Sequence, residues 1–154
     1  MLTIHTAQPA RFALNVRVPA WVTKSAAVRV NNQAVRVSAR SGTFLKLERP
    51  WRDGDTVAVT FPMSLRFEAV DAQTPDRVAL MYGPLIMVAV ADGVVNLQGD
   101  KAKPDAWIHA RGDEPLMFQA GNDGVMFRPF YLLRNERYTT YCHLAAAGFN
   151  EGYK

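Results

Sequence analysis

The stretch Leu14-Asn-Val-Arg-Val18 alternates apolar and polar side chains, and this alternation decides the class of fold. The Val-Arg-Val triplet that ends it occurs twice more, at residues 28–30 and 35–37. Successive side chains of a β-strand point to opposite faces, so each triplet places two branched apolar side chains on one face and a cation on the other. The pattern predicts strands that are half-buried in an antiparallel sheet.

Turn residues separate these predicted strands. Asn31 and Asn32 lie between the second and third triplets, and asparagine tolerates the left-handed conformation that a two-residue hairpin needs. The segment Pro50-Trp-Arg-Asp-Gly-Asp55 separates two strand-like runs, which predicts another hairpin with Asp-Gly at its tip. Further strand-like runs follow at residues 65–69, 77–82 and 85–91.

Strands at this spacing, with almost no helical periodicity, predict an all-β fold. We expect an antiparallel, jelly-roll-like β-sandwich with a long irregular insertion, forming a single domain over residues 1–154. The main strands occupy 1–91, the irregular insertion or connection 92–124, the closing strands 125–144, and a tail that is a short helix or frayed 145–154. The segment 78–91 is apolar on both faces, which indicates the centre of a sheet or a position under a partner domain.

Composition and charge exclude several classes of partner. The chain has 154 residues, 49% of them hydrophobic, which is enough for one domain with a core. The net charge is +4, but the basic residues are scattered, so we expect no nucleic-acid partner. No apolar run reaches the ~18 residues of a spanning helix, and no signal peptide is visible, so we expect no membrane partner.

The residues that carry chemistry do not form a recognisable site. Cys142 is the single cysteine, and a neighbouring strand residue such as His143 points to the opposite face, which argues against a nucleophile–base pair or a zinc site. Turns and solvent faces account for the carboxylates, among them Glu48, Glu68, Asp71, Asp113 and Glu114. The glycines do not form a phosphate-binding loop. We therefore expect no catalytic residue, no metal and no cofactor.

Four aromatic residues are candidate sugar or domain-interface contacts: Trp21, Trp51, Trp107 and Tyr82. Tryptophan faces stack on sugar rings, but an indole that covers a core edge and donates its N–H to a partner is the commoner arrangement. We favour packing or an interface for Trp21 and Trp51, and both alternatives stay open for Trp107.

A series of longer segments resembles one known family. The segments, in order, are Phe12-Ala-Leu-Asn-Val-Arg-Val-Pro-Ala-Trp21, Val28-Arg-Val-Asn-Asn32, Gly42-Thr-Phe-Leu-Lys-Leu-Glu-Arg-Pro-Trp-Arg-Asp-Gly-Asp55, Phe61-Pro-Met-Ser-Leu-Arg66 and Arg77-Val-Ala-Leu-Met-Tyr-Gly-Pro-Leu85. They resemble the C-terminal β-sandwich region of glycoside hydrolase family 127, the β-L-arabinofuranosidase-type enzymes. Arg128-Pro-Phe-Tyr131, Glu136-Arg-Tyr138 and Tyr141 are similar to the segment that closes this region. The resemblance does not extend over residues 92–124.

The resemblance implies that the chemistry lies elsewhere. In that family catalysis belongs to an (α/α)₆ barrel that precedes the sandwich, with a cysteine nucleophile and a zinc held by cysteines and a glutamate. Those positions lie upstream of the residues present here, and Cys142 is not in the family's cysteine cluster. The chain is thus similar to a detached accessory region, and Met1, which directly precedes a strand-like run, is consistent with truncation.

Three hypotheses about function follow. The first is a non-catalytic domain that supports the upstream catalytic barrel of a parent protein. The second is a carbohydrate-binding module for plant-type glycans, which requires at least two tryptophan or tyrosine side chains exposed on one face. The third, an autonomous hydrolase, is disfavoured by the missing barrel. The compartment stays open, with a periplasmic or secreted parent compatible with the resemblance.

Overall fold

The computed structural model describes residues 1–112, 114–121 and 124–145. Its regular structure is almost entirely β-strand, which confirms the predicted all-β fold. The chain divides into two compact units, Met1–Met63 and Ser64–Lys154, where the sequence suggested one domain. Each unit has a hydrophobic cluster of its own. The predicted tail lies, from residue 146 onward, outside the described residues.

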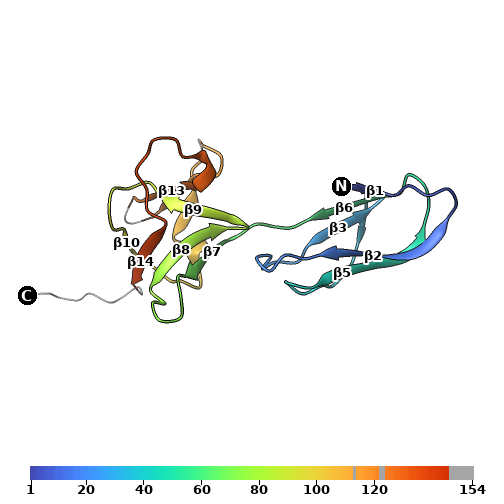
Figure 1. Ribbon diagram of the computed structural model, residues 1–154, viewed down its shortest axis with the longest axis horizontal. Helices are drawn as coiled ribbons and strands as arrows, with labels where there is room; N and C mark the ends of the chain where they lie inside the picture. Colours follow the sequence, from blue (N-terminus) through green and yellow to red (C-terminus); the bar gives the residue numbers. More distant parts are fainter. Residues whose placement is uncertain (113, 122–123, 146–154) are drawn as a thin grey trace, which may run out of the picture. The chain divides into compact units, whose positions relative to one another are not determined.

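The first unit is a small β-sandwich. Its strands are β1 (Leu2–Thr3), β2 (Ala10–Arg17), β3 (Ala27–Val30), β4 (Gln33–Val35), β5 (Phe44–Trp51) and β6 (Thr56–Thr60). One sheet has the order β1-β6-β3-β4, and the other consists of β2 and β5 (Figure 1). The apolar side chains of the alternating pattern point inward and form the core, including Val28, Val30, Leu45, Leu47 and Val57. Burying a side chain of this size contributes about 1.5–3 kcal/mol.

The two turn predictions have different outcomes. Asn31 and Asn32 have φ values of 49° and 63°, and they join β3 to its antiparallel partner β4 as predicted. The hairpin predicted at residues 50–55 is wrong, because β5 pairs with β2 over its whole length and β6 pairs with β3. Leu45 on β5 and Val57 on β6 belong to one cluster, so the two strands contribute to the same core from different sheets. The Asp-Gly turn therefore carries the chain from one sheet to the other.

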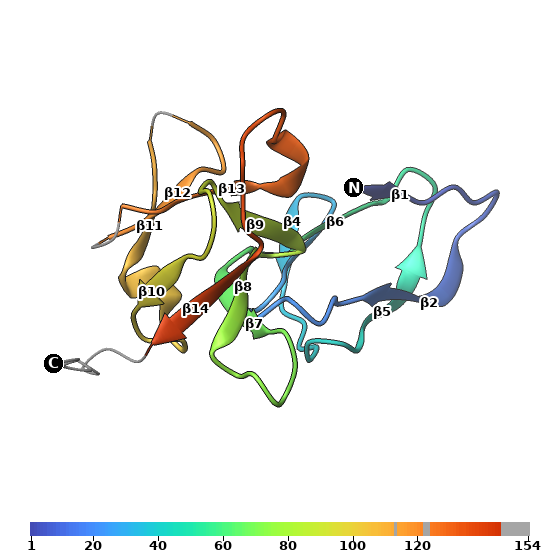
Figure 2. The same ribbon diagram turned by 60° about the vertical axis from the view of Figure 1, so that its left-hand side comes forward.

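The second unit is built on one eight-stranded sheet. The path of its sheet is β10-β14-β8-β9-β13-β12-β11, with β7 paired to β8, and Figure 2 shows the sheet curling. Its strands are antiparallel except for the parallel pair of β10 and β14. The elements are β7 (Leu65–Ala69), β8 (Arg77–Tyr82), β9 (Leu85–Ala89), β10 (Asn96–Gln98), β11 (Ile108–Ala110), β12 (Phe118–Ala120), β13 (Met126–Pro129) and β14 (Tyr141–Ala145), with single-turn 3₁₀ helices η1 (Pro104–Ala106) and η2 (Phe130–Leu132).

The segment 78–91, which is apolar on both faces, lies in the interior of this sheet. β8 pairs with β7 along one edge and with β14 and β9 along the other, while β9 also pairs with β13. This is the central position that the apolar pattern indicated. The side chains of Val78, Leu80 and Met87 are buried in the cluster of the second unit.

The segment 92–124, expected to be irregular, contributes three short strands to the sheet. β10, β11 and β12 have three residues each, and η1 lies between the first two of them. Leu97, Ile108 and Phe118 are the buried apolar residues of these strands and belong to the same cluster as the central strands. A strand of three residues is too short to reveal a two-residue alternation in the sequence. The sequence therefore did not predict these strands, whose buried side chains pack in the tertiary structure.

Candidate functional site

Trp51 is a core residue. Its side chain is 0% exposed, and its indole N–H donates a hydrogen bond to the carbonyl oxygen of Phe12 at 3.0 Å. The ring of Phe12 lies 5.9 Å away, and the Arg49 guanidinium lies 5.3 Å from the centroid of the indole. Trp51 thus packs inside the first unit.

Trp21 and Tyr82 are half-buried. The Trp21 ring contacts Phe61 in a T-shaped arrangement, with centroids 6.3 Å apart. Tyr82 packs against Phe118, with centroids 5.0 Å apart and an interplanar angle of 54°. Both residues lie at the margin of a hydrophobic cluster, Trp21 in the first unit and Tyr82 in the second.

Trp107 is held on several sides. Its ring stacks on Phe67 at 5.7 Å with an interplanar angle of 18°, and its indole N–H donates to the carbonyl oxygen of Asp100 at 3.1 Å. The backbone of Gly99 lies so close that an added Cβ would be 2.2 Å from a ring carbon. No ring contact joins any two of the four candidate residues in the described part of the chain.

The exposed aromatic surface lies at residues for which sequence reasoning predicted no contact role. We call Phe130, Tyr131, Leu132 and Tyr138 the aromatic knob: their exposed fractions are 53%, 61%, 39% and 44%. The first three form η2, and the ring of Phe130 contacts that of Tyr138 at 5.6 Å. One available signal was the run of large side chains directly after Pro129, outside any alternating pattern. Clustered exposed apolar groups of this kind mark interaction sites.

Glu136 holds the loop that carries the aromatic knob. Its carboxylate accepts hydrogen bonds from the backbone N–H groups of Arg134 and Asn135 at 2.8 and 3.0 Å. The Arg128 guanidinium donates to the same carboxylate at 2.9 Å and also lies 3.4 Å from Glu114. The Arg134 N–H is the main cause that lowers the pKa of Glu136. The loop is therefore fixed by a carboxylate that stays ionised.

Four carboxyl groups and one thiol among the described residues have shifted pKa values. The pKa values of Glu48, Asp55, Asp71 and Glu136 are lowered, in each case chiefly by a hydrogen bond to the carboxylate. Burial raises the pKa of the Cys142 thiol to about 11. In the described ranges, no three or more His, Cys, Asp or Glu side chains group so that they could hold a metal ion. Nor does any described helix have the length and apolar character to cross a membrane.

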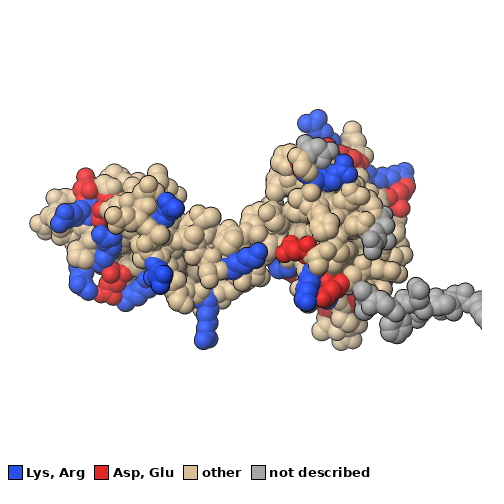
Figure 3. All heavy atoms as spheres, turned by 180° about the vertical axis from the view of Figure 1, so that it is seen from behind, with Lys and Arg blue, Asp and Glu red and all other residues tan. Residues whose placement is uncertain are grey.

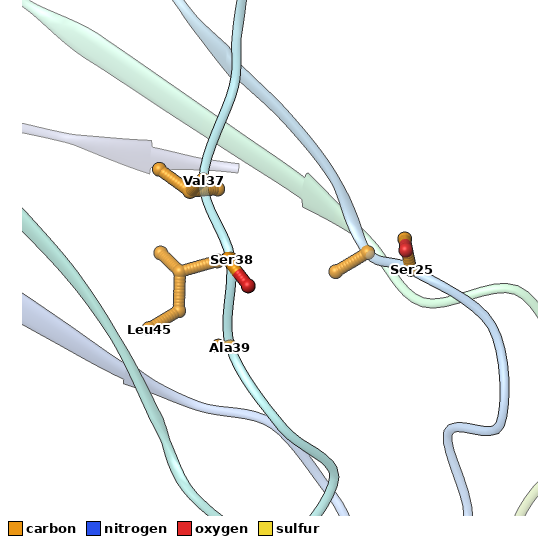
Figure 4. A pocket seen from close by; sticks show the side chains of 6 residues that line it. Ser25, Val37, Ser38, Ala39 and Leu45 are labelled. Carbon is orange, nitrogen blue, oxygen red and sulfur yellow. The ribbon is translucent and has the colours of Figure 1, made fainter.

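Two cavities lie in the first unit. One, of about 250 Å³, is lined by Ser25, Ala26, Val37, Ser38, Ala39 and Leu45, and Figure 4 shows Ser25 on a different segment from Val37, Ser38 and Ala39. The other, of about 290 Å³, is lined by Asn31, Arg49, Pro50, Arg52 and Asp55. On the face drawn in Figure 3, basic and acidic side chains are interspersed, without a continuous patch of one sign.

Comparisons with known proteins show which family this chain resembles. Residues 1–63 match the model of the β-L-arabinofuranosidase GH127 middle domain. The resemblance to glycoside hydrolase family 127 is confirmed. Because the matched model describes a middle domain, the first unit resembles a region inside the family's chains, where we had assigned the whole sequence to a C-terminal region. No protein in a curated set matches the sequence.

Solved structures of the GH127 group share the fold. A GH127 β-L-arabinofuranosidase from Geobacillus stearothermophilus T6 has a TM-score of 0.64 at 18% identity, over 93% of this chain and 28% of its own. A protein described as a glycoside hydrolase has a TM-score of 0.63 at 19% identity, over 93% of this chain and 30% of its own. The chain thus spans less than a third of the structures that it resembles, and it has the fold of a glycoside-hydrolase-family domain.

Proposed function

We propose that this chain is a non-catalytic β-sandwich region that supports the (α/α)₆ catalytic barrel of a β-L-arabinofuranosidase-type glycoside hydrolase. The observation that carries the proposal is the match of residues 1–63 to the GH127 middle-domain model, together with a chain that spans less than a third of the GH127 structures whose fold it shares. A cysteine nucleophile acts as a thiolate, and the Cys142 thiol is buried with its pKa raised to about 11, so it stays protonated. A carboxyl group that donates a proton to a leaving group needs a raised pKa. Among the described residues, every carboxyl group with a shifted pKa has a lowered one.

A supporting role requires a contact surface, and the aromatic knob supplies one. Phe130, Tyr131 and Leu132 are large and exposed, and the Glu136 carboxylate holds the backbone that follows them by accepting from the N–H groups of Arg134 and Asn135. Aromatic side chains with little conformational freedom are common at the centre of protein interfaces. We place the catalytic barrel of the parent protein on this surface.

The enzymatic part of the proposal is tested with the purified chain and an aryl β-L-arabinofuranoside. We expect no turnover above the rate in buffer, for the wild type and for Cys142→Ser alike. Turnover that disappears in Cys142→Ser, or in a variant of one carboxylate with the fold intact, would refute it.

The supporting part is tested with the parent protein's barrel, expressed alone and together with this chain. We expect the chain to raise the Tm of the barrel and Tyr131→Ser to reduce that effect. Phe44→Ser is the matched control. Phe44 is also an exposed aromatic residue, at 58%, but it belongs to the first unit, whereas the aromatic knob belongs to the second. An equal effect of the two variants would remove the knob from the interface.

A second candidate function is glycan binding. Tyr131 and Tyr138 meet its requirement for exposed aromatic side chains better than the tryptophans do. Titration with L-arabinose, arabino-oligosaccharides and other plant glycans, followed by backbone amide shifts, would show localised shifts at residues 130–138 if the knob binds sugar. If no amide resonance shifts, the aromatic knob does not bind these sugars, and contact with the barrel stays the proposed role.

A further inference from the structure

The second cavity of the first unit lies where β5 ends and the chain turns toward β6. Asn31, from the turn between β3 and β4, lines it together with Arg49, Pro50, Arg52 and Asp55. It is an open depression lined mostly by exposed residues, and its volume of about 290 Å³ lies just below the range of small-molecule sites, so it suits one ring rather than an oligomer.

Asp55 is the acceptor of this cavity, and internal hydrogen bonds fix its position. One carboxylate oxygen accepts from the Asn31 side-chain amide at 2.8 Å, and the other accepts from the Arg52 backbone N–H at 2.9 Å. Asn31 is itself fixed, because its amide oxygen accepts from the Thr56 backbone N–H at 2.8 Å. An ionised carboxylate has about four acceptor positions, so roughly two remain open to a ligand.

The guanidinium groups of Arg49 and Arg52 are the hydrogen-bond donors of this cavity. Arg49 lies over the indole of the buried Trp51, which orients its side chain, and its Nε donates to the Pro50 carbonyl at 3.4 Å. Within the described ranges neither Arg49 nor Arg52 has a carboxylate oxygen within ion-pair distance. Both guanidinium groups nevertheless help to lower the pKa of Asp55, so all three charges share one small space without direct contact.

We propose that this cavity binds a sugar acid, a single uronate ring whose carboxylate contacts Arg49 and Arg52 and whose hydroxyl groups donate to Asp55. An arginine fork matches a carboxylate with two parallel hydrogen bonds. An anion without hydroxyl groups would leave the open acceptor positions of Asp55 unfilled, and a neutral sugar would supply no counter-charge for the two guanidinium groups. A hydroxy acid satisfies the donors and the acceptor together. The site is independent of the proposed barrel contact.

Binding is weak and depends on salt, because both arginine side chains are exposed to solvent. We expect a Kd of about 1 mM for sodium D-galacturonate at low ionic strength. Backbone amide shifts of the full chain are the readout, with D-galactose and inorganic phosphate at the same concentrations as comparison ligands. The expected result is saturable shifts with galacturonate at residues 31, 49, 51, 52, 55 and 56.

Charge variants complete the test. Arg52→Gln keeps the backbone N–H that holds Asp55, and we expect it to weaken galacturonate binding at least tenfold, as we also expect for Arg49→Gln. Arg17→Gln, an exposed arginine at the end of β2, removes the same charge from the same unit and leaves the affinity unchanged. Equal responses to phosphate, equal responses to galactose, no response to galacturonate, or an equal loss in Arg17→Gln would each overturn the proposal.

Discussion

Replacing Gly99 with alanine tests the packing role assigned to Trp107. The new Cβ would lie 2.2 Å from Cε2 of the indole and 2.6 Å from Cδ2 and Cζ2. Carbon atoms pack at about 3.5–4.0 Å, so the ring or the backbone must move by roughly 1.3 Å or more. The indole cannot move freely, because it stacks on Phe67 and donates to the Asp100 carbonyl. Overpacking of this kind costs about 1–3 kcal/mol, and loss of the hydrogen bond adds about 1 kcal/mol.

We therefore expect Gly99→Ala to lower the free energy of unfolding by roughly 2–4 kcal/mol and Tm by about 5–15 °C. Urea unfolding followed by circular dichroism measures the first, and the indole N–H resonance of Trp107 reports the movement of the ring. Gly112→Ala is the matched control, since no heavy atom lies within 4 Å of its added Cβ, and we expect a change within about 0.5 kcal/mol. If Gly99→Ala behaves like the control and leaves the indole signal in place, Trp107 is not packed as described.

Three further outcomes are expected. The Cys142 thiol has a folded pKa of about 11 against an ordinary value of 9.0, so the unfolded chain loses its proton first as pH rises. Native protein should resist thiol reagents at pH 8, and its stability should fall by roughly 2 kcal/mol between pH 9 and 11, in contrast to Cys142→Ser. Glu136→Gln should accelerate hydrogen exchange at the amides of Arg134 and Asn135, whereas Glu68→Gln should not, and equal exchange in both variants would contradict the role of Glu136. In a Trp21→Phe/Trp107→Phe variant, acrylamide should barely quench the fluorescence of Trp51, and quenching as strong as in the urea-unfolded protein would mean that its side chain is exposed.

The local elements of the fold were predictable from the residues. The runs 65–69 and 77–82 have the bounds of β7 and β8, and the Asn31-Asn32 turn joins the strands that it separates in the sequence. These features depend on side-chain alternation and on backbone conformations that neighbouring residues set. The hairpin expected at residues 50–55 does not form, and the sequence could not show this, because a strand's choice of partner depends on residues far along the chain.

The aromatic contact residues were likewise predictable only in part from the sequence. The four predicted aromatic residues lie in packing contacts, while Phe130, Tyr131 and Tyr138 are exposed. Residue type indicates that an aromatic side chain is able to stack on a sugar or a partner. Whether its ring is free to do so depends on what the rest of the unit packs against it, as Gly99 and Phe67 do against Trp107.

By itself, the sequence determined the period of two, the asparagine turn and the family resemblance, because each of these is written in residues that lie close together in the chain. Tertiary structure alone decided the division into two units, the position of β5 and β6 in different sheets and the burial of Trp51. It also decided the gathering of Arg49, Arg52 and Asp55 with Asn31 around one cavity. The physical reason is that these outcomes depend on the sum of contacts between distant segments, and local propensity does not encode that sum.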